Sequence, residues 1–160
     1  MSLSQLEKIS IVSFEDKYSQ AFKELNQWWI EKYFTMEEAD YKALDNPKSY
    51  IIDNGGFIAI ALLNNKPIGV CALIKTEKSK FDYELSKMGV APDTHGKGIG
   101  FLLGSFILKK AKELGAKTVF LETNTILKPA ISLYKKLGFI EISGVTTPYA
   151  RSNYQMQINL

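Results

Sequence analysis

One glycine-rich stretch constrains this chain more than any other, because it joins a strand-like segment to a helix-like one. Residues 88–103 read MGVAPDTHGKGIGFLL: an apolar run stops at Pro92, Gly96, Gly98 and Gly100 follow, and apolar residues then recur at helical spacing. A loop of this kind leaves several backbone N–H groups unpaired at the positive end of the helix dipole, where anions bind. Glycine also lets an anion approach the backbone closely. The stretch therefore predicts a loop that binds a pyrophosphate.

The rest of the chain predicts a mixed α/β architecture around this loop. Apolar and β-branched runs indicate strands at 9–14, 57–63, 67–75, 81–90, 118–123, 139–145 and 154–158. Apolar residues at helical spacing indicate helices over about 17–34, 37–44, 98–114 and 129–137. A turn at 64–66 makes the second and third strands a β-hairpin. Strand, loop, helix and strand over 81–123 form a βαβ unit, which implies parallel pairing and a right-handed crossover.

The strand at 81–90 does not divide into one apolar and one polar face. Its two alternating sets are Tyr83, Leu85, Lys87 and Gly89 against Asp82, Glu84, Ser86 and Met88. Because each set mixes apolar and polar residues, we expect both faces of this strand to be covered.

Composition favours one ordinary globular domain and excludes several classes of protein. We expect a single domain over residues 1–160, since 160 residues with 46% hydrophobic content can form a sizeable core. A net charge of +3 without a block of Lys or Arg argues against nucleic-acid binding. No apolar run approaches a membrane span, and residues 1–7 lack the features of a signal peptide. We therefore expect a cytoplasmic protein without a membrane partner.

Cys71 is the only cysteine, which excludes a disulfide framework and a cysteine metal cluster. It lies in the apolar run 68–74, where we expect it to be a buried small hydrophobe. We expect no metal cofactor.

Three glycine-rich phosphate motifs compete for the loop. A Walker loop requires Ser or Thr after the Gly-Lys pair, where this chain has Gly98. A dinucleotide fingerprint requires a third glycine at the position of Phe101, and it follows an early βα start instead of a hairpin. The remaining motif is Gln/Arg-x-x-Gly-x-Gly/Ala, the acyl-coenzyme A loop of the GNAT acetyltransferases. Residues 95–100, HGKGIG, match it at both glycines and depart from it at His95.

Three flanking segments strengthen the resemblance to the GNAT family. Residues 84–90 (ELSKMGV) resemble the family's fourth strand, and residues 121–124 (LETN) resemble its fifth. Residues 129–139 (PAISLYKKLGF) are similar to its C-terminal signature, a helix that carries a tyrosine and ends in Gly-Phe. The resemblance covers about 56–142. It implies the GNAT fold: a central mixed sheet of six to seven strands, a V-shaped splay between strands 4 and 5, and about four flanking helices.

The resemblance also implies an activity, the transfer of an acetyl group from acetyl-CoA to an amine by direct attack in a ternary complex. The amine would belong to an unidentified small molecule or peptide. A non-catalytic acyl-CoA-binding or regulatory module with the same fold is the alternative, because fold alone does not establish activity. Homodimers are common in the family, so a second copy is an expected partner.

Acetyl-CoA would be held mainly by backbone groups. The loop would bind the pyrophosphate and the fourth strand the pantetheine arm, with Lys97 either contributing charge or solvated. His95 stands where Arg or Gln is usual, and its side chain is either solvated, with the backbone binding the phosphate, or catalytic. Asn124 matches a position that bonds the pantetheine or a water, or else it caps the following segment. The expected acetyl-CoA contacts are Met88, Gly89, Val90, His95, Gly96, Lys97, Gly98, Ile99, Gly100, Phe101, Asn124 and Tyr134.

Two side chains are expected to move protons. Tyr134 matches the family tyrosine that protonates the departing thiolate, although a packed aromatic is the alternative. Glu84 matches the base carboxylate of some branches, whereas a strand glutamate often faces solvent or pairs with lysine. We prefer Glu84 to Glu122 and to Asp82 as the base.

The acceptor site is expected in the aromatic segments near the N-terminal helices and in the loop at 145–151. Trp29, Phe34 and Tyr149 are the expected contacts, with core packing as the alternative for the two N-terminal aromatics. Arg151 would either bind an acceptor carboxylate or remain solvated.

Overall fold

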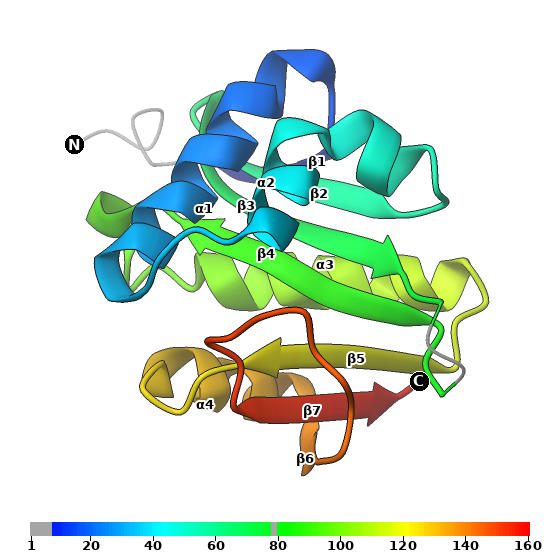
Figure 1. Cartoon of the computed structure of the whole chain (residues 1–160). Coiled ribbons are helices and arrows are strands. Elements are labelled where there is room, and N and C mark those ends of the chain that lie inside the picture. The colour runs from blue at the N-terminus through cyan, green and yellow to red at the C-terminus, as the bar shows by residue number, and fades with distance from the viewer. Residues whose placement is uncertain (1–7, 78–79) are drawn as a thin grey trace.

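The computed structural model describes residues 8–77 and 80–160, and in them one seven-stranded sheet is flanked by helices (Figure 1). Residues 1–7, which carry the argument against a signal peptide, lie outside the described part. The strands are β1 (Ile9–Ser13), β2 (Phe57–Leu63), β3 (Lys66–Lys75), β4 (Tyr83–Val90), β5 (Thr118–Thr123), β6 (Ile140–Ile142) and β7 (Tyr154–Asn159). The helices that flank them are α1 (Ser19–Tyr33), α2 (Glu38–Asp45), the π-helix η3 (Pro47–Ile52), α3 (Ile99–Glu113) and α4 (Lys128–Leu137).

The strand order is β1-β2-β3-β4-β5-β7-β6, and β4 with β5 is the parallel pair. These two strands pair only at Tyr83–Val119 and Glu84–Phe120. Beyond these pairs β4 continues to Val90 and β5 to Thr123 without partners between them, and Figure 1 shows the strands diverging. The predicted mixed sheet and its splay are therefore confirmed.

Two hydrophobic cores cover the two faces of the sheet. Leu103 and Ile107 of α3 pack with Leu73 and Leu85 on one face. On the other face, α1, α2 and η3 pack against β2 and β3, with Phe22 fully buried. This arrangement explains why β2 and β3 read as nearly continuous apolar runs, since both faces of each strand are covered. Cys71 is buried, as predicted.

Most predicted elements are present, and the differences lie at their ends. Asn64 and Asn65 both have positive φ (50° and 69°), as a two-residue hairpin turn requires. The strand predicted at 139–145 is wrong in length, because it ends at Ile142 and leaves a long connection to β7. The π-helix at 47–52 was not predicted, since its Pro47 reads as a helix stop.

A β-bulge in β4 explains the mixed alternation of its sequence. Val70 pairs with Gly89 and Ala72 with Ser86, so Lys87 and Met88 both lie opposite Cys71. Lys87 has a φ of 51°, a left-handed conformation that is uncommon for a residue with a side chain. As a result Lys87 points toward α2 instead of toward α3.

Candidate functional site

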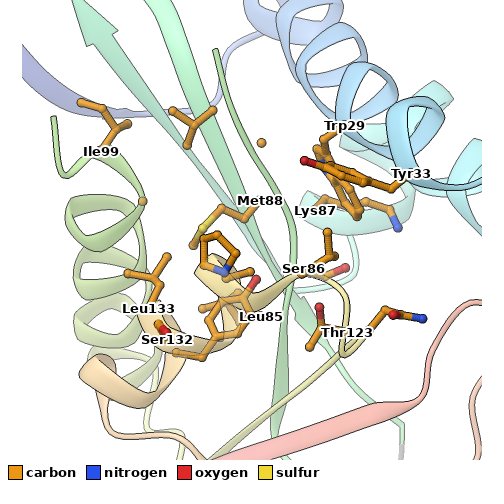
Figure 2. Close-up of a pocket in the computed structure, with 18 of the residues that line it drawn as sticks. Trp29, Tyr33, Leu85, Ser86, Lys87, Met88, Ile99, Thr123, Ser132 and Leu133 are labelled. Atoms are coloured by element: carbon orange, nitrogen blue, oxygen red, sulfur yellow. The ribbon is translucent and has the colours of Figure 1, made fainter. Parts of the chain in front are cut away.

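The gap between β4 and β5 opens into a cleft of about 760 Å³. Strand residues form its floor, α1 and the 143–153 connection form one side, and α3 and α4 form the other. Figure 2 shows Trp29 and Tyr33 projecting from α1 beside Lys87, whereas Leu133 of α4 lies on the opposite side. Its lining includes nearly all the predicted site residues: Trp29, Phe34, Glu84, Met88, Gly89, Val90, His95, Gly96, Gly98, Ile99, Gly100, Phe101, Asn124, Tyr134 and Tyr149. The exception is Lys97, which is exposed and does not line the cleft.

The glycine loop has the geometry of an anion cradle. Gly96 and Gly98 have positive φ values of 86° and 74°, and a Cβ built on either would meet no atom within 4 Å. The first hydrogen bond of the helix runs from Leu102 N to Gly98 O at 3.1 Å. Among the described residues, the N–H groups of Ile99 and Gly100 find no backbone acceptor. The loop therefore offers open space, free donors and a helix N-terminus at one edge of the cleft, which fits a pyrophosphate.

Gly89 is required for another reason, the close approach of β4 to α1. A Cβ at this position would lie 2.8 Å from the carbonyl oxygen of Leu25 and 3.2 Å from the backbone nitrogen of Asn26. Both atoms belong to the backbone of α1 and cannot move aside easily. Gly89 thus fixes the depth of the cleft between α1 and the strand.

Tyr134 lies on α4, on the α3 side of the gap. Its ring meets that of Phe139 edge-on at 6.1 Å between centroids. Burial raises the pKa of the phenol, and the nearby Cys71 thiol raises it further. The phenol therefore stays protonated at neutral pH, the state required of a proton donor.

The side chains of His95 and Asn124 form hydrogen bonds with backbone groups of the chain itself. The His95 ring nitrogen Nε2 lies 3.3 Å from Val90 O, to which it donates, and the ring meets Trp28 edge-on. Asn124 donates from Nδ2 to Arg151 O at 2.7 Å, and its Oδ1 accepts from Ile126 N at 2.9 Å. Asn124 therefore fixes the 143–153 connection to the end of β5.

The far end of the cleft is aromatic and encloses a cation. The guanidinium of Arg151 lies 4.6 Å from the ring centroid of Tyr149, 5.8 Å from that of Trp29 and 6.0 Å from that of Phe34. These are the three predicted acceptor contacts, brought together from positions more than 100 residues apart.

Arg151 belongs to a buried ion cluster centred on Asp40. Its Nη1 and Nη2 donate to the two oxygens of Asp40 at 2.7 and 2.6 Å, and Lys87 Nζ donates to Oδ1 at 2.8 Å. The side chain of Asp40 is 0% exposed, that of Lys87 3% and that of Arg151 12%. The expectation of a solvated Arg151 is wrong, because its side chain is 12% exposed and pairs with Asp40. The alternative, a ligand for an acceptor carboxylate, stays a prediction.

The cluster changes the ionisation of its members. Burial by itself would raise the pKa of Asp40, but hydrogen bonds from Arg151 and the charge of Lys87 outweigh it and lower the pKa to about 2. Lys87 Nζ also donates to the Tyr149 hydroxyl at 2.9 Å. Burial, reinforced by the charge of Glu84, raises the pKa of Tyr149, which therefore remains a neutral phenol.

Two carboxylates border the gap from opposite strands. Glu84 belongs to the last β4–β5 pair, at the apex of the splay, and Glu122 lies two residues beyond its partner Phe120. Both oxygens of Glu122 are buried, and neither has a hydrogen-bond partner among the described residues. The buried hydroxyl of Ser152, in the same cleft, is likewise unsatisfied. Glu122, which the sequence favours less than Glu84 as the base, is thus a buried carboxylate without a hydrogen-bond partner among the described residues.

Sequence reasoning missed the Asp40 cluster and the side-chain direction of Lys87. The broken alternation of residues 81–90 was a usable signal for the bulge. Nothing in the sequence signals that Asp40, Lys87 and Arg151 meet, since 47 and 111 positions separate Asp40 from its two partners.

Comparison with known proteins agrees with this geometry. The family model described as "Acetyltransferase (GNAT) family" matches residues 14–139, which include the splay, the glycine loop and the α4 tyrosine. The chain belongs to the GNAT acetyltransferase family. The match extends beyond the segment that carries the resemblance in the sequence and takes in α1 and α2 as well.

Solved GNAT structures share the fold over nearly the whole chain. A GNAT-family acetyltransferase from Staphylococcus aureus Mu50 superimposes with a TM-score of 0.86 at 21% identity, covering 95% of this chain and 99% of the other. YncA of Salmonella typhimurium, a putative acetyltransferase solved with acetyl-CoA, gives 0.77 at 17% identity, with coverages of 94% and 93%. At these identities the matches establish the fold.

Curated relatives match over shorter segments. The uncharacterized N-acetyltransferase YjgM of Escherichia coli is 44% identical over 59 residues, 37% of this chain and 35% of YjgM. The uncharacterized N-acetyltransferase MJ1207 of Methanocaldococcus jannaschii is 34% identical over 93 residues, 56% of this chain and 41% of MJ1207. The chain spans between about a third and a half of the length of these GNAT relatives.

Residues 8–77 and 80–160 contain neither a metal-binding group of side chains nor a membrane-spanning helix. No three His, Cys, Asp or Glu side chains are grouped so as to hold a metal ion. No helix in those ranges combines the length and apolarity needed to cross a bilayer.

Proposed function

We propose that this chain transfers the acetyl group of acetyl-CoA to a primary amine, which attacks the thioester directly while both substrates are bound. The observation that carries the proposal is the β4–β5 gap, with the glycine loop on one side and the aromatic, acidic end of the cleft on the other. A thioester that follows β4 from the loop would meet an amine that enters past Trp29. Cofactor-bound relatives such as YncA support the choice of acetyl-CoA.

The loop and the unpaired part of β4 would hold the coenzyme through backbone groups. Gly96 and Gly98 leave room for the pyrophosphate, and the N–H groups at the start of α3 are free to bond it. Beyond Glu84, β4 has no partner on its β5 side, so Met88, Gly89 and Val90 present main-chain groups there for the pantetheine arm. A backbone N–H at this edge also polarises the thioester carbonyl as charge develops on its oxygen.

The chemical step requires one proton to leave the amine and one to reach the sulfur. The amine nitrogen forms a bond to the carbonyl carbon, and the carbon–sulfur bond breaks. The departing thiolate takes the phenolic proton of Tyr134, which is present in the resting enzyme because burial raises the pKa of the phenol. Glu84, at the apex of the splay, accepts the surplus proton of the amine directly or through water, and solvent then returns both groups to their starting states.

The remaining predicted residues would position these parts. Asn124 anchors the connection that carries Tyr149 and Arg151, and His95 anchors the end of β4 to the loop through Val90. Trp29, Phe34 and Tyr149 form the acceptor wall. Lys97, exposed outside the cleft, contributes at most long-range charge to the coenzyme.

Two measurements test the proposal. Calorimetry with acetyl-CoA should show one-site binding, and a free-thiol assay over a panel of primary amines should show release of CoA that depends on the amine. Binding without amine-dependent thiol release over a broad panel would identify a non-catalytic acyl-CoA-binding module instead.

A further inference from the structure

The cleft contains a carboxylate, that of Glu122, to which no described residue donates a hydrogen bond. We propose that Glu122 binds the ammonium group of the acceptor, which loses one proton to solvent before the neutral amine attacks, and that the acceptor is a small cationic amine with an apolar body and no carboxylate beside the amine. This inference rests on the proposed acetyl transfer and specifies its acceptor.

Buried side-chain oxygens without hydrogen-bond partners lie near the end of β5. Both Glu122 oxygens and the Ser152 hydroxyl are buried without partners in the described structure, whereas most buried polar groups are hydrogen-bonded. Two hydrogen bonds hold these segments together, Asn124 Nδ2 to Arg151 O and Asn153 N to Thr123 O. An ammonium group carries three donors and a positive charge, so it satisfies both a carboxylate and a hydroxyl oxygen.

Arg151 and Lys87, two cations beside the cleft, are already paired with carboxylates. Arg151 gives both terminal nitrogens to Asp40, and Nη1 also lies 3.3 Å from Glu37 Oε2. Lys87 gives its ammonium to Asp40 and Tyr149. The charges of these four ionised groups cancel, so the cluster offers an acceptor carboxylate no net positive charge, and Glu122 would repel it.

Two further lysines line the cleft, Lys136 from α4 and Lys32 from α1. The ammonium of Lys32 lies over the rings of Trp28 and Tyr33, at 5.0 and 5.4 Å from their centroids. Those two rings are 39% and 47% exposed, which places Lys32 at the solvent-facing rim. Lys32 therefore does not offset the charge of Glu122 inside the cleft.

One wall of the cleft is aromatic. Trp29, Phe34 and Tyr149 bring three rings to one side of the cleft, and the phenol of Tyr149 is held neutral. Aromatic surfaces of this kind accommodate an aryl or branched alkyl group. An apolar amine that carries its charge at one end matches the wall and Glu122 together.

The experiment compares phenethylamine, L-phenylalanine amide and L-phenylalanine as acceptors in the free-thiol assay. The last two share one skeleton and differ in whether a carboxylate or a neutral carboxamide lies beside the amine. Because the amide is also the weaker base, kcat/KM is compared per concentration of neutral amine. We expect kcat/KM for the amide to exceed that for phenylalanine by about 100-fold or more, with phenethylamine similar to the amide. Equal values for the amide and the free acid, or a preference for the acid, overturn the inference and leave acetyl transfer itself intact.

A variant pair assigns the effect to Glu122. Glu122→Gln keeps the shape and removes the charge, and it should raise KM for phenethylamine at least about 10-fold with a smaller change in kcat. Glu141→Gln, on an exposed glutamate of β6, is the matched control and should match the unmodified chain. A fall in kcat with unchanged KM for Glu122→Gln would instead make this group a proton acceptor and overturn the binding role.

Calorimetry separates failure of the inference from failure of the proposed function. Each amine is titrated into the protein saturated with CoA, so that binding is measured without turnover. Tighter binding of phenethylamine than of phenylalanine supports the inference even where no amine is acetylated. Binding of phenylalanine that is equal or tighter overturns it.

Discussion

Arg151 and Asp40 form a two-point ion pair, at 2.7 and 2.6 Å, across 111 positions of sequence. The pair fastens the connection between β6 and β7 to α2, and thereby places Tyr149 against the cleft. Since Lys87 shares the same carboxylate, one buried aspartate sets the position of residues from three separate segments.

Asp40→Asn should destabilise the fold strongly. The change leaves Lys87 buried without its counter-charge and Arg151 with Glu37 alone, and breaking a buried pair of this kind typically costs about 3–5 kcal/mol of unfolding free energy. Urea unfolding followed by circular dichroism measures it. Asp45→Asn is the matched control, because Asp45 pairs with Lys23 at the surface, and it should change stability little. Equal effects of the two changes would mean that the cluster does not stabilise the fold.

Stability should fall as acid protonates Asp40. The pKa of this carboxyl is about 2 in the folded chain against an ordinary value of 3.8, so folding favours its ionised form. The resulting stabilisation, on the order of 2 kcal/mol, is fully present above pH 3.8 and is lost as the pH falls toward 2. Thermal melts of the unmodified chain and of Asp40→Asn between pH 2 and pH 6 should show this extra slope only in the unmodified chain.

Tyr134→Phe should lower kcat about 100-fold or more while acetyl-CoA affinity stays nearly constant. The hydroxyl is the group that would protonate the thiolate, whereas the ring packing on Phe139 is retained. Tyr154→Phe, in β7 and outside the cleft lining, is the control. Full turnover of Tyr134→Phe at saturating substrate would contradict the proton-donor role.

Glu84→Gln should abolish the acidic limb of the pH profile of kcat/KM. That limb reports protonation of the base in the free enzyme, and a glutamine has no proton to titrate there. A fall of about 100-fold at neutral pH should accompany it. If the acidic limb persists in Glu84→Gln and disappears in Glu122→Gln, the base belongs to β5 instead of β4.

Gly98→Ala should weaken acetyl-CoA binding measured by calorimetry. The added methyl group occupies space that is open in the structure and that the pyrophosphate would use, at a φ of 74°. Gly115→Ala is a matched control, since its φ of 85° and its open surroundings impose the same backbone strain away from the cleft. Comparable coenzyme affinity in the two variants would remove the loop from the binding site.

The sequence by itself determined the parts of the site that are contiguous in the chain. The glycine loop depends on local conformational freedom and on the start of one helix. The sequence pattern of Gly96, Gly98 and Gly100 therefore predicts it without tertiary information. The βαβ unit follows from hydrophobic periodicity and chain chirality, and Tyr134 is fixed relative to the end of its helix.

Tertiary structure decided everything that depends on long-range packing. The bulge at Lys87 follows from the pairing of β4 with β3, and it turns a side chain that alternation assigns to one face toward the other. The charge balance of the acceptor end is likewise invisible in sequence, because composition counts Arg151 and Glu122 but not their partners. Asp40 pairs with Arg151, whereas the Glu122 oxygens have no hydrogen-bond partner within residues 8–77 and 80–160, and this difference is the basis for proposing that the cleft favours a cation.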